Sequence, residues 1–351
     1  MADRKSRFRR WLRTLLIIVA VLAIVYPLSF FLRRSWIVHQ LASSSRLANT
    51  PRGPVEYLEG GRGPATLLIL HGTPGGYDEG LLLAQWIRAE RSFRFIAPSR
   101  PGYLRTPVEV GSSPAEAAAA MIALLDTLGA TRSSVLAWSG AGPTALELAG
   151  RYPQRISALV LLSTRVRGDD KYRFADPSDR GTPIAAESLR PDTGIFGPDA
   201  KGYLGAVMFR LLPNRFFERY FPAETRSMGL AVERLRQLRT VTSPPSRRYP
   251  GKANDQWQFA SLDPEPRMDV RVPTLIVHSP GDEAVDISHA YWARDQIPGA
   301  ELLEVESESH FTTLNPASTR IVMEFLQAHA EGDPVLPNRP QPARPDLGGP
   351  Q

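Results

Sequence analysis

Short apolar runs recur through the middle of the chain and predict the strands of a sheet. The clearest is Ala65–Leu70, and another, Val135–Trp138, leads into a cluster of small residues. Runs of this length, bounded by turn residues, are typical of parallel strands buried on both faces. Further strands of this kind are predicted over 55–59, 94–98, 156–163, 273–278 and 301–305.

Between these runs, apolar positions recur at three- and four-residue spacing, which is the helical period. The best example follows Ser113–Glu116, a capping box with proline at the first helical position, and it ends near Gly129. Other helices are predicted over 143–152 and 287–296, with a last one after residue 310. The alternation of strand and helix predicts an α/β fold with a doubly wound, mostly parallel sheet.

The alternation stops between residues 165 and 270. This stretch is rich in Arg, Asp and Pro, and only Tyr203–Leu212 and Ala231–Leu238 look helical. Four aromatic residues stand close together between those two pieces: Phe216, Phe217, Tyr220 and Phe221.

The N-terminus has a different pattern, because residues 14–32 form 19 uncharged and mostly apolar positions. At about 1.5 Å per residue a helix of this length spans about 28 Å, close to the hydrocarbon thickness of about 30 Å. Pro27 is tolerated in such a helix. We therefore expect one transmembrane helix, in contact with membrane lipid, ahead of the α/β domain.

The charges around this segment predict its orientation. Six basic residues precede it and Arg33 and Arg34 follow directly, so the N-terminus is expected in the cytoplasm and the domain on the far, periplasmic or extracellular, side. A cleaved signal peptide with its apolar region at 14–26 is the alternative. The two arginines and the lack of an A-x-A site near the end of the run favour an uncleaved anchor.

Charge and composition restrict the rest of the chain. The net charge is +6, but residues 1–34 carry +7, so the remainder sums to −1 and gives no electrostatic reason to bind nucleic acid. The absence of cysteine excludes disulfides and zinc-thiolate sites. We expect a basic N-terminus and anchor over 1–34, a linker over 35–54, the folded domain over 55–330 and a Pro-rich, disordered tail over 331–351.

A corner follows the strand that ends at Trp138. A strand that reverses sharply into a helix forces its corner residue into a strained backbone, which requires small residues two positions before and after it. Around Ser139 those positions hold Ala137 and Ala141, and Pro143 begins the next helix. Such a corner presents the serine hydroxyl at the carboxyl end of the sheet.

This corner resembles the nucleophile elbow of the α/β-hydrolase family, with alanine at both outer glycines of G-x-S-x-G. The glycine-rich turn over 71–76, beginning His71-Gly72-Thr73, resembles the oxyanion loop of the same family. The D-x-x-V ending over 282–285 resembles the site of the triad acid, and His310 lies in an S-H-F context before the last helix. The resemblance covers about residues 55–330.

The resemblance implies a role for each of these positions. Ser139 is the expected nucleophile, His310 the base and Asp282 the acid, in the chain order that this fold requires. The backbone amides of Gly140 and Thr73 are the expected oxyanion donors, and His71 is expected to support the loop. The stretch 165–270 is expected to form a helical cap. The residues expected to line an apolar pocket are Trp138, Phe216, Phe217, Tyr220 and Phe221.

The implied activity is that of a membrane-anchored serine hydrolase that cleaves a carboxylic ester, or a related acyl bond, of a small apolar substrate. Serine at position 139 argues against dehalogenases and epoxide hydrolases, which carry aspartate there. An aminopeptidase of the proline iminopeptidase type is an alternative, although those members place tryptophan where this chain has Gly140. A membrane-tethered binding protein on the same fold is the other. Neither a metal nor another cofactor is implied.

Overall fold

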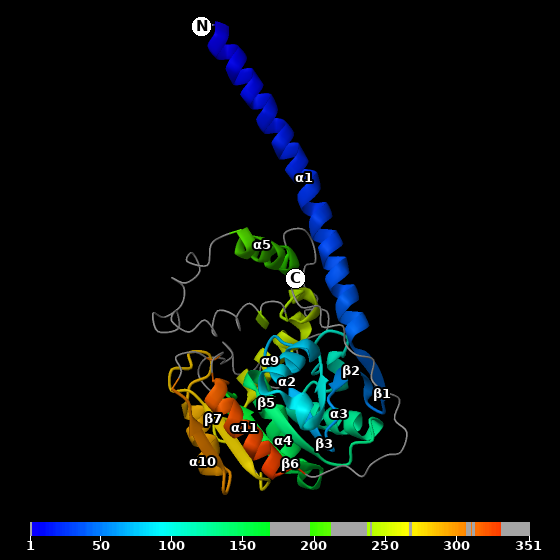
Figure 1. The fold of residues 1–351 in the computed structure, drawn as a ribbon, viewed down its shortest axis with the longest axis vertical. Coiled ribbons are helices and arrows are strands. Elements are labelled where there is room, and N and C mark those ends of the chain that lie inside the picture. The colour runs from blue at the N-terminus through cyan, green and yellow to red at the C-terminus, as the bar shows by residue number, and fades with distance from the viewer. Residues whose placement is uncertain are drawn as a thin grey trace.

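A computed structural model of the protein describes residues 2–168, 197–211, 237–238, 241–266, 269–306, 310 and 313–330. One sheet lies between helices, and a long N-terminal helix projects from this body (Figure 1). The aromatic group of residues 216–221 and the tail over 331–351 lie outside the described residues.

The sheet has eight strands in the order β1-β2-β4-β3-β5-β6-β7-β8. Strands β3 to β8 run parallel, whereas β1 and β2 are antiparallel at one edge. This topology confirms the predicted mostly parallel sheet. The strands are β1 (Arg46–Thr50), β2 (Gly53–Gly60), β3 (Ala65–Leu70), β4 (Phe93–Pro98), β5 (Ser133–Trp138), β6 (Ile156–Leu162), β7 (Thr274–His278) and β8 (Glu301–Glu304).

Helices cover both faces of the sheet, which explains why its central strands are mostly apolar. Every residue of β3, β5, β6 and β7 is buried. One core cluster joins the sheet to α3, α4 and α10, and a second joins its other face to α2 and α11. The helices are α2 (Tyr77–Ile87), α3 (Pro114–Thr127), α4 (Gly142–Arg151), α10 (Ser288–Gln296) and α11 (Pro316–Ala328).

The insertion lies between β6 and β7 and contains α5 (Pro198–Leu211) and α9 (Tyr249–Ser261). The predicted helix over 203–212 overlaps α5, and only residues 237–238 of the second predicted piece are described. Helix α9 was not predicted. Its buried side chains include Asn254, Asp255 and Gln258, so it has no apolar stripe for the sequence to reveal.

The expected linker over 35–54 is wrong for most of its length. Helix α1 runs over Ala2–Ser44, well beyond the apolar segment, and β1 follows at once and pairs with β2. Strand β1 is short and mostly polar, so its identity as a strand depends on pairing that the apolar pattern does not show.

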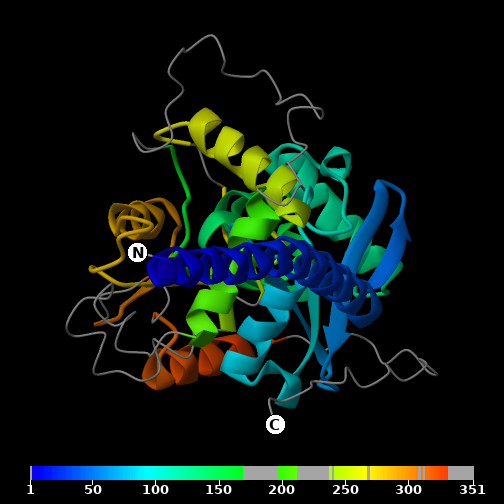
Figure 2. The same cartoon turned by 90° about the horizontal axis from the view of Figure 1, so that it is seen from above.

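Helix α1 projects away from the body along most of its length (Figure 1; Figure 2 views the body from above). Its span Arg7–Ser44 contains a segment long and apolar enough to cross a membrane, and the most apolar 18-residue window in it has a mean hydropathy of 2.8. Membrane anchors and signal sequences share that property. Near the body, α1 has a buried apolar side chain. Phe30 is only 1% exposed, and its ring centroid lies 5.9 Å from that of Tyr203 in α5.

Two polar contacts join α1 to α5. The Arg34 guanidinium pairs with the buried Asp199 carboxylate (Nε–Oδ2, 2.6 Å), and the Tyr203 hydroxyl donates to Ser29 Oγ at 3.0 Å. The end of the apolar segment therefore packs against the insertion.

Candidate active site

Ser139 occupies the turn between β5 and α4 with a φ of +53°, in the left-handed region that non-glycine residues rarely adopt. Ala137 and Ala141 are fully buried on either side of it. A Cβ on Gly142 would lie 2.0 Å from the carbonyl oxygen of Arg165, so only glycine fits there. The corner predicted from small residues is present, and it leaves Ser139 partly exposed.

His310 and Asp282 are hydrogen-bonded to each other, with 2.7 Å between Nδ1 and Oδ2. The other carboxylate oxygen accepts the backbone N–H groups of Ala284 and Val285, each at 2.9 Å. Burial alone would raise the pKa of Asp282. The hydrogen bond and charge of His310, with the amide of Val285, outweigh burial and hold that pKa below its ordinary value. An ionised Asp282 can only accept, so Nδ1 carries the proton and Nε2 is left as the basic atom.

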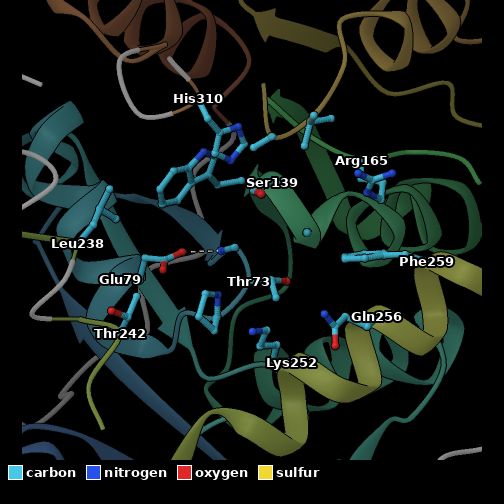
Figure 3. Close-up of a pocket in the computed structure, with 16 residues that line it drawn as sticks. Thr73, Glu79, Ser139, Arg165, Leu238, Thr242, Lys252, Gln256, Phe259 and His310 are labelled. Carbon is cyan, nitrogen blue, oxygen red and sulfur yellow. Dashed lines mark hydrogen bonds between the residues drawn. The ribbon is translucent and has the colours of Figure 1, made fainter. Parts of the chain in front are cut away.

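One cavity of about 410 Å³ brings Ser139 and His310 together (Figure 3). Trp138, the residue before the corner, also lines it and stacks on the His310 ring, with centroids 5.6 Å apart and planes 19° apart. The imidazole is thus oriented both by a carboxylate and by an aromatic face.

The loop over 71–76 packs against the corner at Ser139 and Gly140. A Cβ on Gly72 would lie 3.0 Å from Ser139 Cβ, and a Cβ on Gly140 would lie 2.3 Å from Thr73 Oγ1. Thr73 and Gly140, the expected oxyanion donors, therefore lie side by side and line the same cavity.

His71 supports this loop through hydrogen bonds and is not placed to act as the catalytic base. Its Nε2 accepts the Arg100 N–H at 2.9 Å, so Nδ1 carries the proton and donates to the Gly72 carbonyl at 2.7 Å. Burial, assisted by the charge of Arg100, lowers the pKa of His71 well below its ordinary value. The ring is neutral and supports the loop, as its sequence context predicted.

Helix α9 fastens the same loop through a buried carboxylate. Both oxygens of Asp255 accept from the Arg100 guanidinium, at 2.8 and 2.7 Å, and the Thr73 hydroxyl donates to Oδ2. Arg100 in turn donates through Nε to the His71 carbonyl at 2.9 Å. Asp255 therefore ties the expected oxyanion residue to the insertion.

Arg248, immediately before α9, fastens the other end of the loop. It is 1% exposed, donates to the Gly75 carbonyl at 2.7 Å and pairs with Asp78 at 2.6 Å. Both ends of the loop are thus held by charged side chains from one helix and its N-terminal flank.

The α/β-hydrolase fold family model matches residues 65–316, which is most of the chain and contains every one of these groups. The chain belongs to the α/β-hydrolase fold family.

The alignments with individual relatives cover nearly the whole length of each relative. The uncharacterised hydrolase YcgS of Bacillus subtilis is 28% identical over 284 residues, covering 79% of this chain and 96% of the relative. A pimeloyl-[acyl-carrier protein] methyl ester esterase of Aromatoleum aromaticum is 24% identical, covering 74% and 96%. A 2-hydroxy-6-oxononadienedioate/2-hydroxy-6-oxononatrienedioate hydrolase of Pseudomonas putida is also 24% identical, covering 82% and 97%.

Among solved structures, an α/β-hydrolase fold protein from Nakamurella multipartita superimposes with a TM-score of 0.64. It is 29% identical and covers 81% of this chain and 99% of that one. The relatives are hydrolases that differ in the bond named, so hydrolase is the level at which they agree.

Glu79 is a residue of this α/β hydrolase that no motif revealed. It lines the cavity, is 3% exposed, and its Oε1 accepts the Gly72 N–H at 2.6 Å. Burial raises its pKa to about 7, against the lowering effect of that hydrogen bond. Only the loop over 71–76 gives it a role, so sequence reasoning had no local signal for it.

The cap-side wall of the cavity also differs from expectation. Of the predicted lining only Trp138 is among the described residues, and Phe259 of α9 is the described aromatic of the insertion that lines the cavity. Besides Phe259, the described insertion contributes the apolar Leu238 and the polar residues Arg165, Thr242, Lys252 and Gln256, while Ala284 and Val285 line the cavity from the segment after β7. Among the described residues, no cluster of His, Cys, Asp or Glu could hold a metal ion.

Proposed function

We propose that the protein is a membrane-anchored serine hydrolase that cleaves a carboxylic ester of a small substrate through an acyl-enzyme. The observation that carries the proposal is the 2.7 Å bond between His310 Nδ1 and the Asp282 carboxylate, beside Ser139 in one cavity. A strained serine, a fixed imidazole and a buried anion are together the parts of a serine-nucleophile triad.

Each group has one task in the reaction. A serine hydroxyl is a weak nucleophile, so His310 Nε2 accepts its proton as Ser139 Oγ attacks the ester carbonyl. Asp282 stabilises the imidazolium that forms. The amides of Gly140 and Thr73 stabilise the oxyanion, each contributing about 3–4 kcal/mol. The imidazolium then protonates the leaving alkoxide, and water activated by His310 hydrolyses the acyl-enzyme.

The apolar part of the substrate lies against Trp138, Leu238 and Val285, which form the described apolar wall of the cavity. The predicted pocket residues Phe216, Phe217, Tyr220 and Phe221 lie outside the described residues and belong to the same proposal. Each methylene buried there contributes about 0.8 kcal/mol, so kcat/KM rises as the acyl chain lengthens from two to six carbons. Alanine at Phe217 or Phe221 should flatten that rise and leave acetate esters nearly unchanged. A flat profile in the parent would overturn the assignment.

Hydrolysis of a carbon–carbon bond is the second candidate, favoured by the Pseudomonas putida relative. The same serine, histidine and aspartate can serve both reactions. The aminopeptidase and binding-protein alternatives have less support, because Gly140 follows the nucleophile and the triad is complete.

The test is a substrate panel on the full-length protein in detergent, comprising acyl esters, a 2-hydroxy-6-oxodienoate and an aminoacyl amide. Esters should be hydrolysed fastest, and Ser139→Ala should lower that rate on the order of 10⁴-fold. Ser43→Ala, at an exposed position of α1, is the matched control and should change nothing. Retention of half the parent rate by Ser139→Ala would remove Ser139 from its role. Faster turnover of the dienoate would favour the second candidate.

Helix α1 is a retained anchor in this proposal. Cleavage near Ser43 would remove Phe30 from its buried contact with Tyr203 and remove Arg34 from the buried Asp199. Those contacts give the body a structural use for the helix that a discarded signal peptide would lack.

A further inference from the structure

We propose that the cap-side wall of the cavity is a binding site for a negatively charged group, so the substrate is an ester that carries a carboxylate. The site comprises Lys252 and Gln256 of α9 with Arg165, three residues beyond the end of β6. This inference rests on the proposed hydrolase and names its substrate class.

Helical spacing places three residues of α9 on one face. Lys252, Gln256 and Phe259 follow one another by four and three residues, and all three line the cavity. In Figure 3 the Lys252 and Gln256 side chains lie on the opposite side of Thr73 from Ser139. An ammonium and an amide are thus directed at the cavity of the nucleophile.

A second face of α9 packs against the body and holds the helix in position. Asp255 and the preceding Arg248 are bound to the loop over 71–76, and Gly251 packs so closely on Tyr103 that a Cβ there would lie 2.3 Å from its ring. Because α9 is fixed by its buried face, the backbone positions of Lys252 and Gln256 are fixed relative to Ser139, and their exposed side chains extend from that fixed helix.

Arg165 adds a second positive charge to the same wall. It is 3% exposed, its backbone N–H donates to the Ser139 carbonyl at 3.1 Å, and its guanidinium lies 5.4 Å from the centre of the Phe259 ring. The backbone bond ties this residue to the nucleophile corner, and the aromatic ring supports its planar head.

Among the described residues, Glu79 is the acidic residue that lines the cavity, and its Oε1 is bound to the Gly72 amide of the loop. Within the described part of the chain, Lys252 forms no ion pair with a carboxylate. Beside the apolar Leu238 and Phe259, the described cap-side wall therefore presents the Lys252 ammonium, the Gln256 amide and the Arg165 guanidinium, which are donors suited to a carboxylate.

The experiment compares two esters of matched length on the full-length protein in detergent: mono-p-nitrophenyl glutarate, which is anionic, and p-nitrophenyl pentanoate, which is neutral. The parent should prefer the glutarate. Lys252→Met should lower kcat/KM for the glutarate about tenfold, equivalent to about 1.4 kcal/mol, mainly through KM, because it removes a charged hydrogen-bond donor to the carboxylate. The pentanoate rate should hold, and Lys252→Arg should restore part of the preference.

The control is Lys201→Met, at an exposed position of α5 away from the cavity lining, which should leave both rates unchanged. Equal losses for both esters in Lys252→Met would indicate a merely structural lysine and overturn the site. A parent protein that does not prefer the anionic ester would also overturn the anion site. In that case, Ser139-dependent hydrolysis of the pentanoate would still support the proposed function.

Binding of free glutarate, measured by calorimetry on the parent and on Lys252→Met, needs no turnover. Binding that weakens about tenfold in Lys252→Met supports the site even if neither ester is hydrolysed. Binding that is absent from the parent, or equal in both proteins, overturns it.

Discussion

The imidazole of His310 is hydrogen-bonded to the Asp282 carboxylate and stacked on the Trp138 ring. Substitutions at single positions therefore separate the role of the imidazole from the role of its carboxylate partner. His310→Ala should reduce ester hydrolysis about as much as Ser139→Ala does, on the order of 10⁴-fold, because both remove the same proton transfer. Asp282→Asn should cause a smaller loss, since base and oxyanion donors survive. Steady-state kinetics of the three variants check this order. Glu283→Gln is the control, and greater damage there would make the assignment of the acid wrong.

Glu79 predicts how stability depends on pH. Its pKa is about 7 in the folded protein, against an ordinary 4.5, so between these pH values the folded state holds a proton that the unfolded chain has released. Stability therefore falls as pH rises from about 4.5 to 7, by about 3 kcal/mol, and is level above that. Glu79→Gln cannot titrate and can still accept the Gly72 N–H.

Urea midpoints of the parent and Glu79→Gln at pH 5 and pH 8 measure this difference directly. The variant should gain stability relative to the parent as pH rises. Parallel losses in both proteins would mean that Glu79 does not carry the raised pKa.

The proximity of Ser139, Asp282 and His310 could be expected from the sequence, because each follows a strand end or precedes a helix that the apolar pattern marks. The positions of Glu79, Arg165 and Lys252 could not. Their relevance comes from contacts that the apolar pattern does not report: the Gly72 amide, seven residues earlier, for Glu79 and the shared cavity for the other two. A charged residue on a helix is ordinarily solvated, and the sequence alone offers no reason to treat these differently.

Among the elements, α9 has the most influence on the expected oxyanion loop. Asp255→Asn should lower the free energy of unfolding by about 3–5 kcal/mol, because it leaves the buried Arg100 without its anionic partner. Denaturant unfolding checks the value. The comparison variant is Asp269→Asn, whose pair with Arg271 is exposed and should be worth less than about 1 kcal/mol. Equal effects at both positions would contradict a structural role for α9.

The sheet was predictable because fully buried parallel strands are predominantly apolar on both faces, and the predicted β3 and β7 runs agree with the structure to within one residue. The elements that were missed lack that pattern. Strand β1 is a mostly polar edge strand, and α9 buries polar side chains that have partners in the loop and its neighbours. Pairing and ion-pair partners distant in sequence determined them, and periodicity does not report either.

At the scale of the whole molecule, α1 contains the proposed membrane anchor and packs against the insertion that lines the active-site cavity. The intact chain of 38.8 kDa should remain in the membrane fraction after an alkaline carbonate wash. Protease added to intact spheroplasts should digest the body while a cytoplasmic marker survives, as the charge asymmetry around residues 14–32 requires. A protected body would reverse the topology. A soluble product starting near Ser43 would show a cleaved signal.

The central claim is that Ser139 is an activated nucleophile, and covalent labelling tests it without any knowledge of the substrate. The full-length protein would be treated with a fluorophosphonate and the modified residue identified by mass spectrometry. We predict one phosphonylated site, at Ser139, with labelling strongly slowed by His310→Ala and unchanged by Ser43→Ala. Absence of labelling in the folded protein, or labelling that persists in Ser139→Ala, would contradict the account.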